Sequence, residues 1–176
     1  MRYALAEAAA AGEAGEVPIG AVLTMDGELV ASGRNQVERL GDASAHAEML
    51  CLRAAAAATG NWRLNLRPST LYVTVEPCPM CLAAIFAFRV ERLVYAAPNP
   101  RLGAVVGAMR SPTEHPFHRM DVSSGVLAAE AAGLMQGFFR RRRVESEALA
   151  AEGREASRGG DSAAEQIYND RVSGLL

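Results

Sequence analysis

The feature that most constrains the fold is a change of pattern within residues 69–88, which read STLYVTVEPCPMCLAAIFAF. The first part is rich in β-branched and aromatic residues and predicts a buried strand, whereas the alanine-rich second part predicts a helix. Pro79 suits the first turn of that helix, because the backbone N–H that proline lacks has no partner there. Cys78 and Cys81 therefore lie where a strand passes directly into a helix.

Helix and strand patterns alternate through the rest of residues 1–143. The expected helices are residues 1–15, 44–60 and 125–143, and the expected strands are two runs within residues 17–33 and one at 91–97. Asp26 and Gly27 are typical of a tight turn between two strands, and Ser44 is expected to be an N-cap. Residues 98–120 are expected to be loop with at most a short strand. This alternation predicts a layered α/β domain whose sheet is covered on both faces.

The size and charge of the chain limit its class. Its 176 residues, half of them apolar, suit one domain with one core. No apolar run reaches the roughly 18 residues that span a bilayer, and no secretory signal is evident, so we expect a soluble protein without a membrane partner. The net charge is −2, but residues 144–176 hold seven acidic residues against three arginines. This acidic tail has few large apolar residues and is predicted to be disordered, next to a domain of residues 1–143.

The three cysteines are an odd number, and a protein that is not exported keeps its thiols reduced, which argues against disulfides. The Cys-x-x-Cys spacing leaves three interpretations open: a metal site, a thioredoxin-like redox pair, or two buried thiols. Cys51 lies in the middle of an apolar helical stretch and is expected to be a buried residue without a chemical role.

His46 and Glu48 favour the metal site. They form a His-Ala-Glu motif at the start of a helix, 32 residues before Cys78. Catalytic zinc sites have three nitrogen or sulfur ligands from the protein and one open position, and His46, Cys78 and Cys81 supply three. On a helix flank, His46 and Glu48 would diverge by about 200°, so they can meet only above the N-terminus. The metal is therefore predicted where two helix N-termini converge, and Glu48 is free to transfer protons.

The His-x-Glu and Pro-Cys-x-x-Cys motifs together resemble the signature of the cytidine-deaminase-like zinc superfamily. EVPIGAV, the stretch around Asn35, TLYVTVEPCPMC and FFRRRR are similar to the tRNA-specific adenosine deaminases of bacterial type. HPFH, MRYAL and SAHAEMLCLR most resemble the plastid branch of that family. The resemblance covers almost all of residues 1–143 and implies a three-layer α/β/α fold with a central mixed sheet of about five strands.

The resemblance implies a zinc-dependent hydrolase that converts the wobble adenosine of a tRNA anticodon to inosine. It assigns His46, Cys78 and Cys81 to one zinc ion per subunit, and Glu48 to proton transfer beside a zinc-bound hydroxide. Contacts with the nucleoside and the anticodon loop are expected from Asn35, Arg101, Phe138, Phe139 and Arg143. The resemblance also implies a homodimer. The expected location is the chloroplast stroma if the chain comes from the green lineage, with the transit peptide absent from this chain, and otherwise the bacterial cytoplasm.

Other functions share parts of this pattern. A deaminase of a free base or nucleoside, such as cytosine, guanine or deoxycytidylate, has the same zinc signature, and the acidic net charge slightly favours it. A catalytically silent subunit that positions RNA for a partner would have no need of Glu48. A thioredoxin-like protein would leave both His46 and Glu48 without a role. The loop EHPFHRM departs from the family pattern, and its His115 and His118 have no assigned role.

Overall fold

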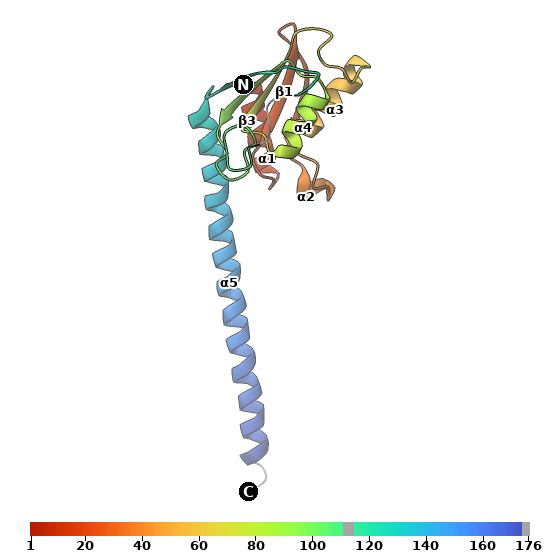
Figure 1. Cartoon of the computed structure of the whole chain (residues 1–176). Coiled ribbons are helices and arrows are strands. Elements are labelled where there is room, and N and C mark those ends of the chain that lie inside the picture. Colours follow the sequence, from red (N-terminus) through yellow and green to blue (C-terminus); the bar gives the residue numbers. More distant parts are fainter. Residues whose placement is uncertain (111–114, 174–176) are drawn as a thin grey trace. The chain divides into compact units, whose positions relative to one another are not determined.

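The structure is a computed structural model that describes residues 1–110 and 115–173, and the side chains of residues 1–110 and 115–151. Its helices and strands alternate along the chain (Figure 1). In chain order they are α1 (Arg2–Glu13), β1 (Gly20–Met25), β2 (Glu28–Arg34), α2 (Val37–Leu40), α3 (Ala47–Thr59), β3 (Ser69–Val75), α4 (Pro79–Ala87), β4 (Arg92–Ala97), β5 (Asp121–Ser124) and α5 (Ala128–Ser173).

The central sheet has five strands in the order β2-β1-β3-β4-β5. β1 is antiparallel to both β2 and β3, whereas β3, β4 and β5 are parallel to one another. A parallel pair needs a crossover connection, and α4 provides it between β3 and β4. The sheet is thus mixed and five-stranded, as the family resemblance implies.

The turn between β1 and β2 has the conformation that Asp26 and Gly27 predict. Met25 pairs with Glu28, so the loop consists of two residues. Both have positive φ values, 52° at Asp26 and 85° at Gly27. Two positive values are the mark of a type I′ turn, whose twist matches that of the flanking strands.

Helices cover both faces of the sheet. The larger core cluster contains apolar residues of α3 and α4 together with alternate residues of β1, β3 and β4, among them Tyr95. The next residue along β4, Ala96, belongs to a second cluster with Leu5 of α1 and Ala131 of α5. Because successive residues of a strand point to opposite faces, α1 and the first turns of α5 cover the face opposite to α3 and α4. This is the expected three-layer arrangement.

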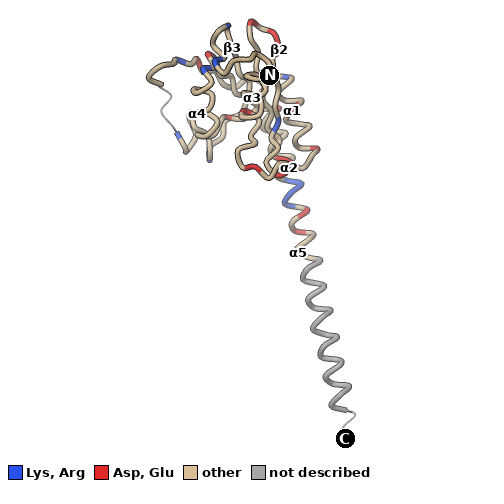
Figure 2. The backbone as a smooth tube through the Cα atoms, turned by 90° about the vertical axis from the view of Figure 1, so that its right-hand side faces the viewer, with Lys and Arg blue, Asp and Glu red and all other residues tan. Residues whose placement is uncertain are grey.

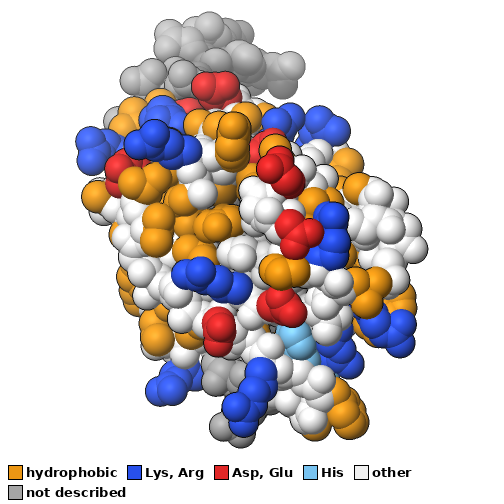
Figure 3. Space-filling view, turned by 90° about the horizontal axis from the view of Figure 1, so that it is seen from above, with side chains coloured by type: hydrophobic (Ala, Val, Ile, Leu, Met, Phe, Trp, Pro, Cys, Tyr) orange, Lys and Arg blue, Asp and Glu red, His pale blue; other side chains and the backbone are white. Residues whose placement is uncertain are grey.

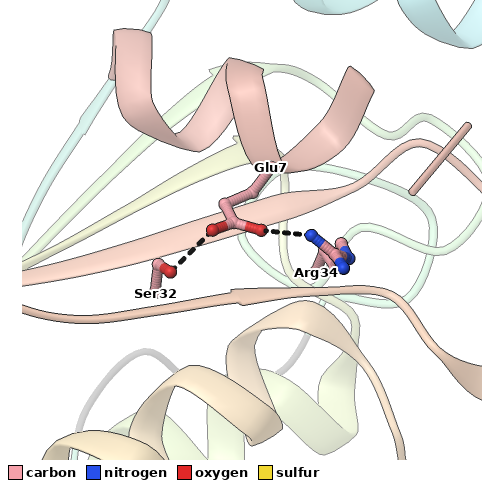
Figure 4. A network of polar contacts seen from close by, with 3 residues as sticks. All are labelled: Glu7, Ser32 and Arg34. Atoms are coloured by element: carbon pink, nitrogen blue, oxygen red, sulfur yellow. Dashed lines mark hydrogen bonds and ion pairs between the residues drawn. The ribbon is translucent and has the colours of Figure 1, made fainter. Parts of the chain in front are cut away.

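Glu7 ties α1 to β2 by polar contacts (Figure 4). One carboxylate oxygen accepts a hydrogen bond of 2.7 Å from the hydroxyl of Ser32, and the other lies 3.4 Å from the guanidinium of Arg34. The ion pair is partly exposed, so it contributes less than about 1 kcal/mol. It fixes the contact between helix and strand more than it stabilises the fold.

The start of α3 differs from the prediction. The helix begins at Ala47 with His46 as its N-cap, and Ser44 is not the cap. Instead, the backbone N–H and hydroxyl of Ser44 both donate to one carboxylate oxygen of Asp42, at 2.8 and 2.7 Å. An aspartate two residues before a serine can bind that serine in a local turn, and here this turn replaces the expected helix cap.

The described chain divides into two compact units, Met1–Phe138 and Phe139–Leu176. The first contains the sheet. In the second, residues 139–173 are helical, where the sequence predicts a disordered tail from residue 144. Alanine, glutamate and arginine are strong helix formers, so a shortage of large apolar residues does not prevent a helix. The division of the chain at residue 143 into a catalytic domain and a tail stays a prediction.

Among the described residues, no helix combines the length and the apolar character needed to cross a bilayer. Viewed from above the orientation of Figure 1, arginine and acidic side chains are interspersed with apolar ones (Figure 3). That face therefore has no broad field of one sign. In the second unit, the four consecutive arginines at residues 140–143 form one continuous basic stretch of α5 (Figure 2).

Candidate metal centre and active site

His46 and Cys78 begin the two helices that cover the same face of the sheet. His46 is the N-cap of α3 and Cys78 is the N-cap of α4, both in extended conformation and neither with a side-chain capping bond. Pro79 occupies the first turn of α4, as predicted, and Cys81 follows two residues later. The side chains of His46, Cys78 and Cys81 are thereby directed to one point above two helix N-termini, where the sequence places the metal.

The geometry of these three side chains fits zinc. Their potential ligand atoms all lie within 4.8 Å of one another. The Nδ1 atom of His46 is 3.7 Å from the Sγ atom of Cys78 and 3.5 Å from that of Cys81. With bonds of about 2.05 Å to nitrogen and about 2.3 Å to sulfur, tetrahedral zinc separates such ligands by about 3.6 Å. One nitrogen and two sulfur donors are a ligand set that zinc favours.

The two cysteines have opposite pKa shifts. Hydrogen bonds with Cys81 and His46 lower the pKa of Cys78 to about 4, against the effect of burial. The bond that Cys81 donates to Cys78 raises the pKa of Cys81, and burial raises it further. The bond with Cys78 also raises the pKa of His46. The lowered pKa of Cys78 favours its thiolate, which is the form that binds a metal.

Glu48 lies in the first turn of α3 and is 4% exposed. Burial raises the pKa of its carboxyl group, and the charge of Cys78 acts in the same direction, whereas a backbone hydrogen bond and His46 oppose the shift. A raised pKa makes a carboxyl group better able to hold a proton and then donate it. Cys51, one helical turn further on, is fully buried, and burial raises the pKa of its thiol to about 12. It is the inert residue that the sequence predicts.

Comparison with known proteins identifies the family of the chain. The family model of the cytidine and deoxycytidylate deaminase zinc-binding region matches residues 1–97, which include His46, Glu48, Cys78 and Cys81. The chain belongs to this deaminase family. Both the recognised resemblance and the fold class predicted from it are confirmed.

Two known proteins and one solved structure are similar to the deaminase over most of its length. It is 46% identical to a tRNA-specific adenosine deaminase of Agrobacterium fabrum over 82% of this chain and 95% of that protein. It is also 46% identical to a chloroplastic tRNA(adenine(34)) deaminase of Arabidopsis thaliana, over 81% of this chain but only 12% of that protein. A solved structure from a study of A-to-I editing by tRNA:A34 deaminases superimposes with a TM-score of 0.70, 47% identity, and coverage of 76% and 96%.

Asn35 follows β2 and is buried, 5% exposed. Its Nδ2 atom donates a hydrogen bond of 3.1 Å to Glu16, which also accepts one of 2.8 Å from the backbone N–H of Arg39. The next residue, Gln36, donates to the carbonyl of Ala45, directly before His46. Asn35 is thus held beside the segment that enters α3, which is compatible with its expected role but does not test it. No role of Glu16 was predicted from the sequence.

The other residues expected to contact RNA lie in two parts of the deaminase. Arg101 is exposed, in the segment between β4 and β5, and Phe138 ends the first unit with a side chain only 6% exposed. Phe139, 43% exposed, and the exposed Arg143 belong to the second unit. Their roles stay predictions.

His115 and His118 are not part of the metal centre. The ring of His115 stacks on Phe86 of α4 with centroids 5.7 Å apart, and the guanidinium of Arg89 lies 3.3 Å from its Nδ1 atom. His118 donates a hydrogen bond of 2.6 Å to the carbonyl of Val90. Both therefore support the segment after the C-terminal end of α4, whereas the metal ligands lie at its N-terminal end.

Proposed function

We propose that this deaminase catalyses the hydrolytic conversion of adenosine to inosine at the wobble position of a tRNA anticodon. The observation that carries the proposal is the buried Glu48 next to the zinc-type cluster of His46, Cys78 and Cys81. The substrate is supported by tRNA-specific relatives that are 46% and 45% identical and almost entirely covered by this chain.

One zinc ion per chain would be held by the Nδ1 atom of His46 and the Sγ atoms of Cys78 and Cys81. Three protein ligands leave the fourth tetrahedral position open, which characterises a catalytic site. When bound, zinc acts as a Lewis acid that makes water a nucleophile at neutral pH. The N-termini of α3 and α4 favour the negative charge of the thiolates, so they support metal binding.

Glu48 moves the protons of the reaction. The reaction consumes one water, forms a C–O bond at C6 of adenine, breaks the C6–N bond and releases ammonia. Glu48 accepts a proton from the attacking water and delivers it to the ring nitrogen next to C6. It then takes the remaining proton from the new hydroxyl group on C6 and gives it to the leaving amine, so the product carries a carbonyl at C6. Its raised pKa suits a group that must both take and give a proton. Its burial keeps these transfers away from bulk water.

RNA contacts are assigned to Asn35, Arg101, Phe138, Phe139 and Arg143. A base in an anticodon loop lies outside a regular duplex, so turning it into a pocket costs little. Asn35 would hydrogen-bond the nucleoside, arginines would contact phosphates, and an aromatic ring would stack on a base. Phe139 is better placed for stacking than Phe138, because its side chain is 43% rather than 6% exposed.

The assembly and the location of the deaminase are further proposals. We propose a homodimer, to be tested by the mass of the purified protein in solution. The chloroplastic relative supports the chloroplast stroma of a green organism, and the bacterial relatives support the bacterial cytoplasm as the alternative. Localising a tagged chain in its native host separates these two.

The deciding experiment is incubation of the zinc-loaded protein with an anticodon stem-loop that carries adenosine at the wobble position. Free adenosine, cytidine and guanine are tested in parallel. Inosine from the stem-loop alone is the expected result. Product from a free base or nucleoside alone would assign the protein to small-molecule deaminases. No product, with zinc bound, would leave an RNA-positioning subunit without activity of its own.

A further inference from the structure

Glu76 is a buried carboxylate that the proposed chemistry does not use. It directly follows β3, precedes the segment that carries Cys78, and is only 2% exposed. None of the ion pairs found among the described residues includes it. A charge of this kind is costly to bury unless hydrogen bonds compensate it.

Backbone N–H groups supply that compensation. One carboxylate oxygen of Glu76 accepts hydrogen bonds from Val105, Val106 and Gly107, at 2.9, 2.6 and 3.0 Å. The other accepts one of 2.9 Å from Asn99. An ionised carboxylate is a pure acceptor, so its charge is compensated by these four N–H donors, three on one oxygen and one on the other. The segment Asn99–Gly107, hereafter the Glu76 loop, is therefore wrapped around a single side chain.

Gly103 lets the Glu76 loop close this tightly. A Cβ atom at this position would overlap the carboxyl group of Glu76 and lie 2.5 Å from the carbonyl oxygen of Asn99. Carbon atoms of real side chains do not approach so closely. Any other residue at position 103 would push the loop away from the carboxylate, so loop and carboxylate fit each other.

The Glu76 loop is also attached to the metal-ligand segment. The backbone N–H of Ala104 donates a hydrogen bond of 2.9 Å to the carbonyl of Pro77, the residue between Glu76 and Cys78. Arg101 is exposed in the same loop, two residues after Asn99 and four before Val105. The position of this arginine relative to the metal centre is thus set by hydrogen bonds to residues 76 and 77.

We propose that Glu76 is a positioning residue that holds the Glu76 loop, with Arg101, beside the metal-ligand segment so that RNA is bound in a productive register. This inference rests on the proposed function, since it requires an RNA substrate. Its structural half, the attachment of the loop by the carboxylate, does not. The two halves are therefore tested by different measurements.

The main variant is Glu76→Gln, which keeps the shape of the side chain but turns one acceptor into a donor that faces backbone N–H groups. In the free protein, amide hydrogen exchange at Asn99, Val105, Val106 and Gly107 is expected to accelerate by about tenfold or more. With the stem-loop substrate, KM is expected to rise by about tenfold, with a smaller change in kcat and unchanged zinc content.

Glu91→Gln is the matched control. Glu91 also accepts a backbone hydrogen bond, of 3.3 Å from Ser69, but it does so where β3 and β4 begin, at the end of the sheet opposite to Glu76. It should leave exchange in the Glu76 loop and the KM for the stem-loop unchanged.

Two further variants test the attachment of the loop and the role of Arg101 independently. Gly103→Ala displaces the loop while retaining Glu76, so it should reproduce both effects, and it carries the test if Glu76→Gln does not fold. Glu76→Gln combined with Arg101→Ala should bind RNA no more weakly than the more affected single variant, because both act through the same contact.

Unchanged exchange in Glu76→Gln would overturn the attachment of the loop. Faster exchange with an unchanged KM, fully additive losses in the double variant, or loss of zinc would overturn the positioning of RNA. If the wild-type protein does not act on the stem-loop, the proposed function fails, while the exchange measurements still decide the role of the carboxylate.

Discussion

The Nδ1 atom of His46 lies 3.5 Å from the Sγ atom of Cys81, although 35 residues separate them in the chain. The contact exists because the strand order brings the starts of α3 and α4 together on one face of the sheet. His46 and Cys78 occupy the N-cap positions of these helices, but neither makes a capping bond. N-cap side chains normally satisfy the helix backbone, whereas these two belong to a cluster that could hold a metal ion.

Removal of one thiolate should release the metal. Cys81→Ser is expected to lose most of its zinc on dialysis against a mild chelator, because a hydroxyl group is a poor zinc ligand. Cys51→Ser is the control, because the Cys51 thiol is buried, donates to the carbonyl of Ala31 at 3.5 Å and does not belong to the cluster of His46, Cys78 and Cys81. That variant should keep its zinc, as measured by elemental analysis. Full zinc occupancy in Cys81→Ser would remove Cys81 from the ligand set.

Replacement of the proton-transfer group should separate metal binding from turnover. Glu48→Gln keeps the size of the buried side chain and cannot take a proton, so inosine formation should fall by about 10²- to 10⁴-fold. Zinc content should not change, because Glu48 is not a ligand. Turnover at the wild-type rate would show that another group moves the protons.

Local signals predicted the parts of the fold that rest on local chemistry. Asp26 and Gly27 favour the backbone conformation of a tight turn, and Pro79 favours the first turn of a helix. The predicted turn and the predicted start of α4 are therefore both confirmed. The grouping of His46, Cys78 and Cys81 was also predictable, since their residue types are restricted and their spacing at two helix starts is unusual. Ser44 was assigned wrongly because it had two possible local partners and the nearby Asp42 prevailed.

Interactions that depend on tertiary structure were not visible in the sequence. Glu76 accepts hydrogen bonds from residues up to 31 positions away, and Glu16 from residues 19 and 23 positions away. A single glutamate next to an apolar strand gives no sign of such partners. Backbone donors leave no trace in residue types, so the role of Glu76 could only follow from the folded chain.

The orientation of Asn35 should depend on Glu16. Glu16 is 2% exposed and accepts from the Asn35 amide, which fixes the amide with its oxygen turned away from Glu16. Glu16→Gln would place an NH₂ group against the donors and is expected to raise KM for the stem-loop by about tenfold. Glu7→Gln, a similar change at a carboxylate of α1 that contacts Ser32 and Arg34 rather than Asn35, is the control (Figure 4). Equal kinetic constants for the two variants would contradict this role.

Two glycine substitutions should have opposite effects on stability. At Gly33, a Cβ atom would lie 2.5 Å from the carbonyl oxygen of Ala47 and 2.7 Å from the backbone nitrogen of Cys51, so Gly33→Ala must displace α3. We expect a loss of about 2 kcal/mol in the free energy of unfolding. At the exposed, helical Gly133, nothing lies within 4 Å, so Gly133→Ala should gain up to about 1 kcal/mol. Denaturant titration measures both, and equal signs would contradict the close packing at Gly33.

His115 should make stability depend on pH. Burial lowers the pKa of its imidazole, and the nearby charges of Arg89 and His118 lower it further. As the pH falls, the imidazole of the unfolded chain therefore takes up a proton near its ordinary pKa of 6.5, whereas the imidazole of the folded chain takes up a proton only at lower pH. The stabilisation is complete above that value and is lost as the pH falls through the lower pKa of the folded state.

The variant His115→Gln should isolate this contribution. Its Tm should fall less steeply than that of the wild type between about pH 7 and about pH 5, since glutamine does not titrate there. The difference in Tm at about pH 8, where the imidazole is neutral in both states, serves as the reference for lost packing on Phe86. Parallel curves for variant and wild type would mean that the proton uptake of His115 does not differ between the folded and unfolded chain.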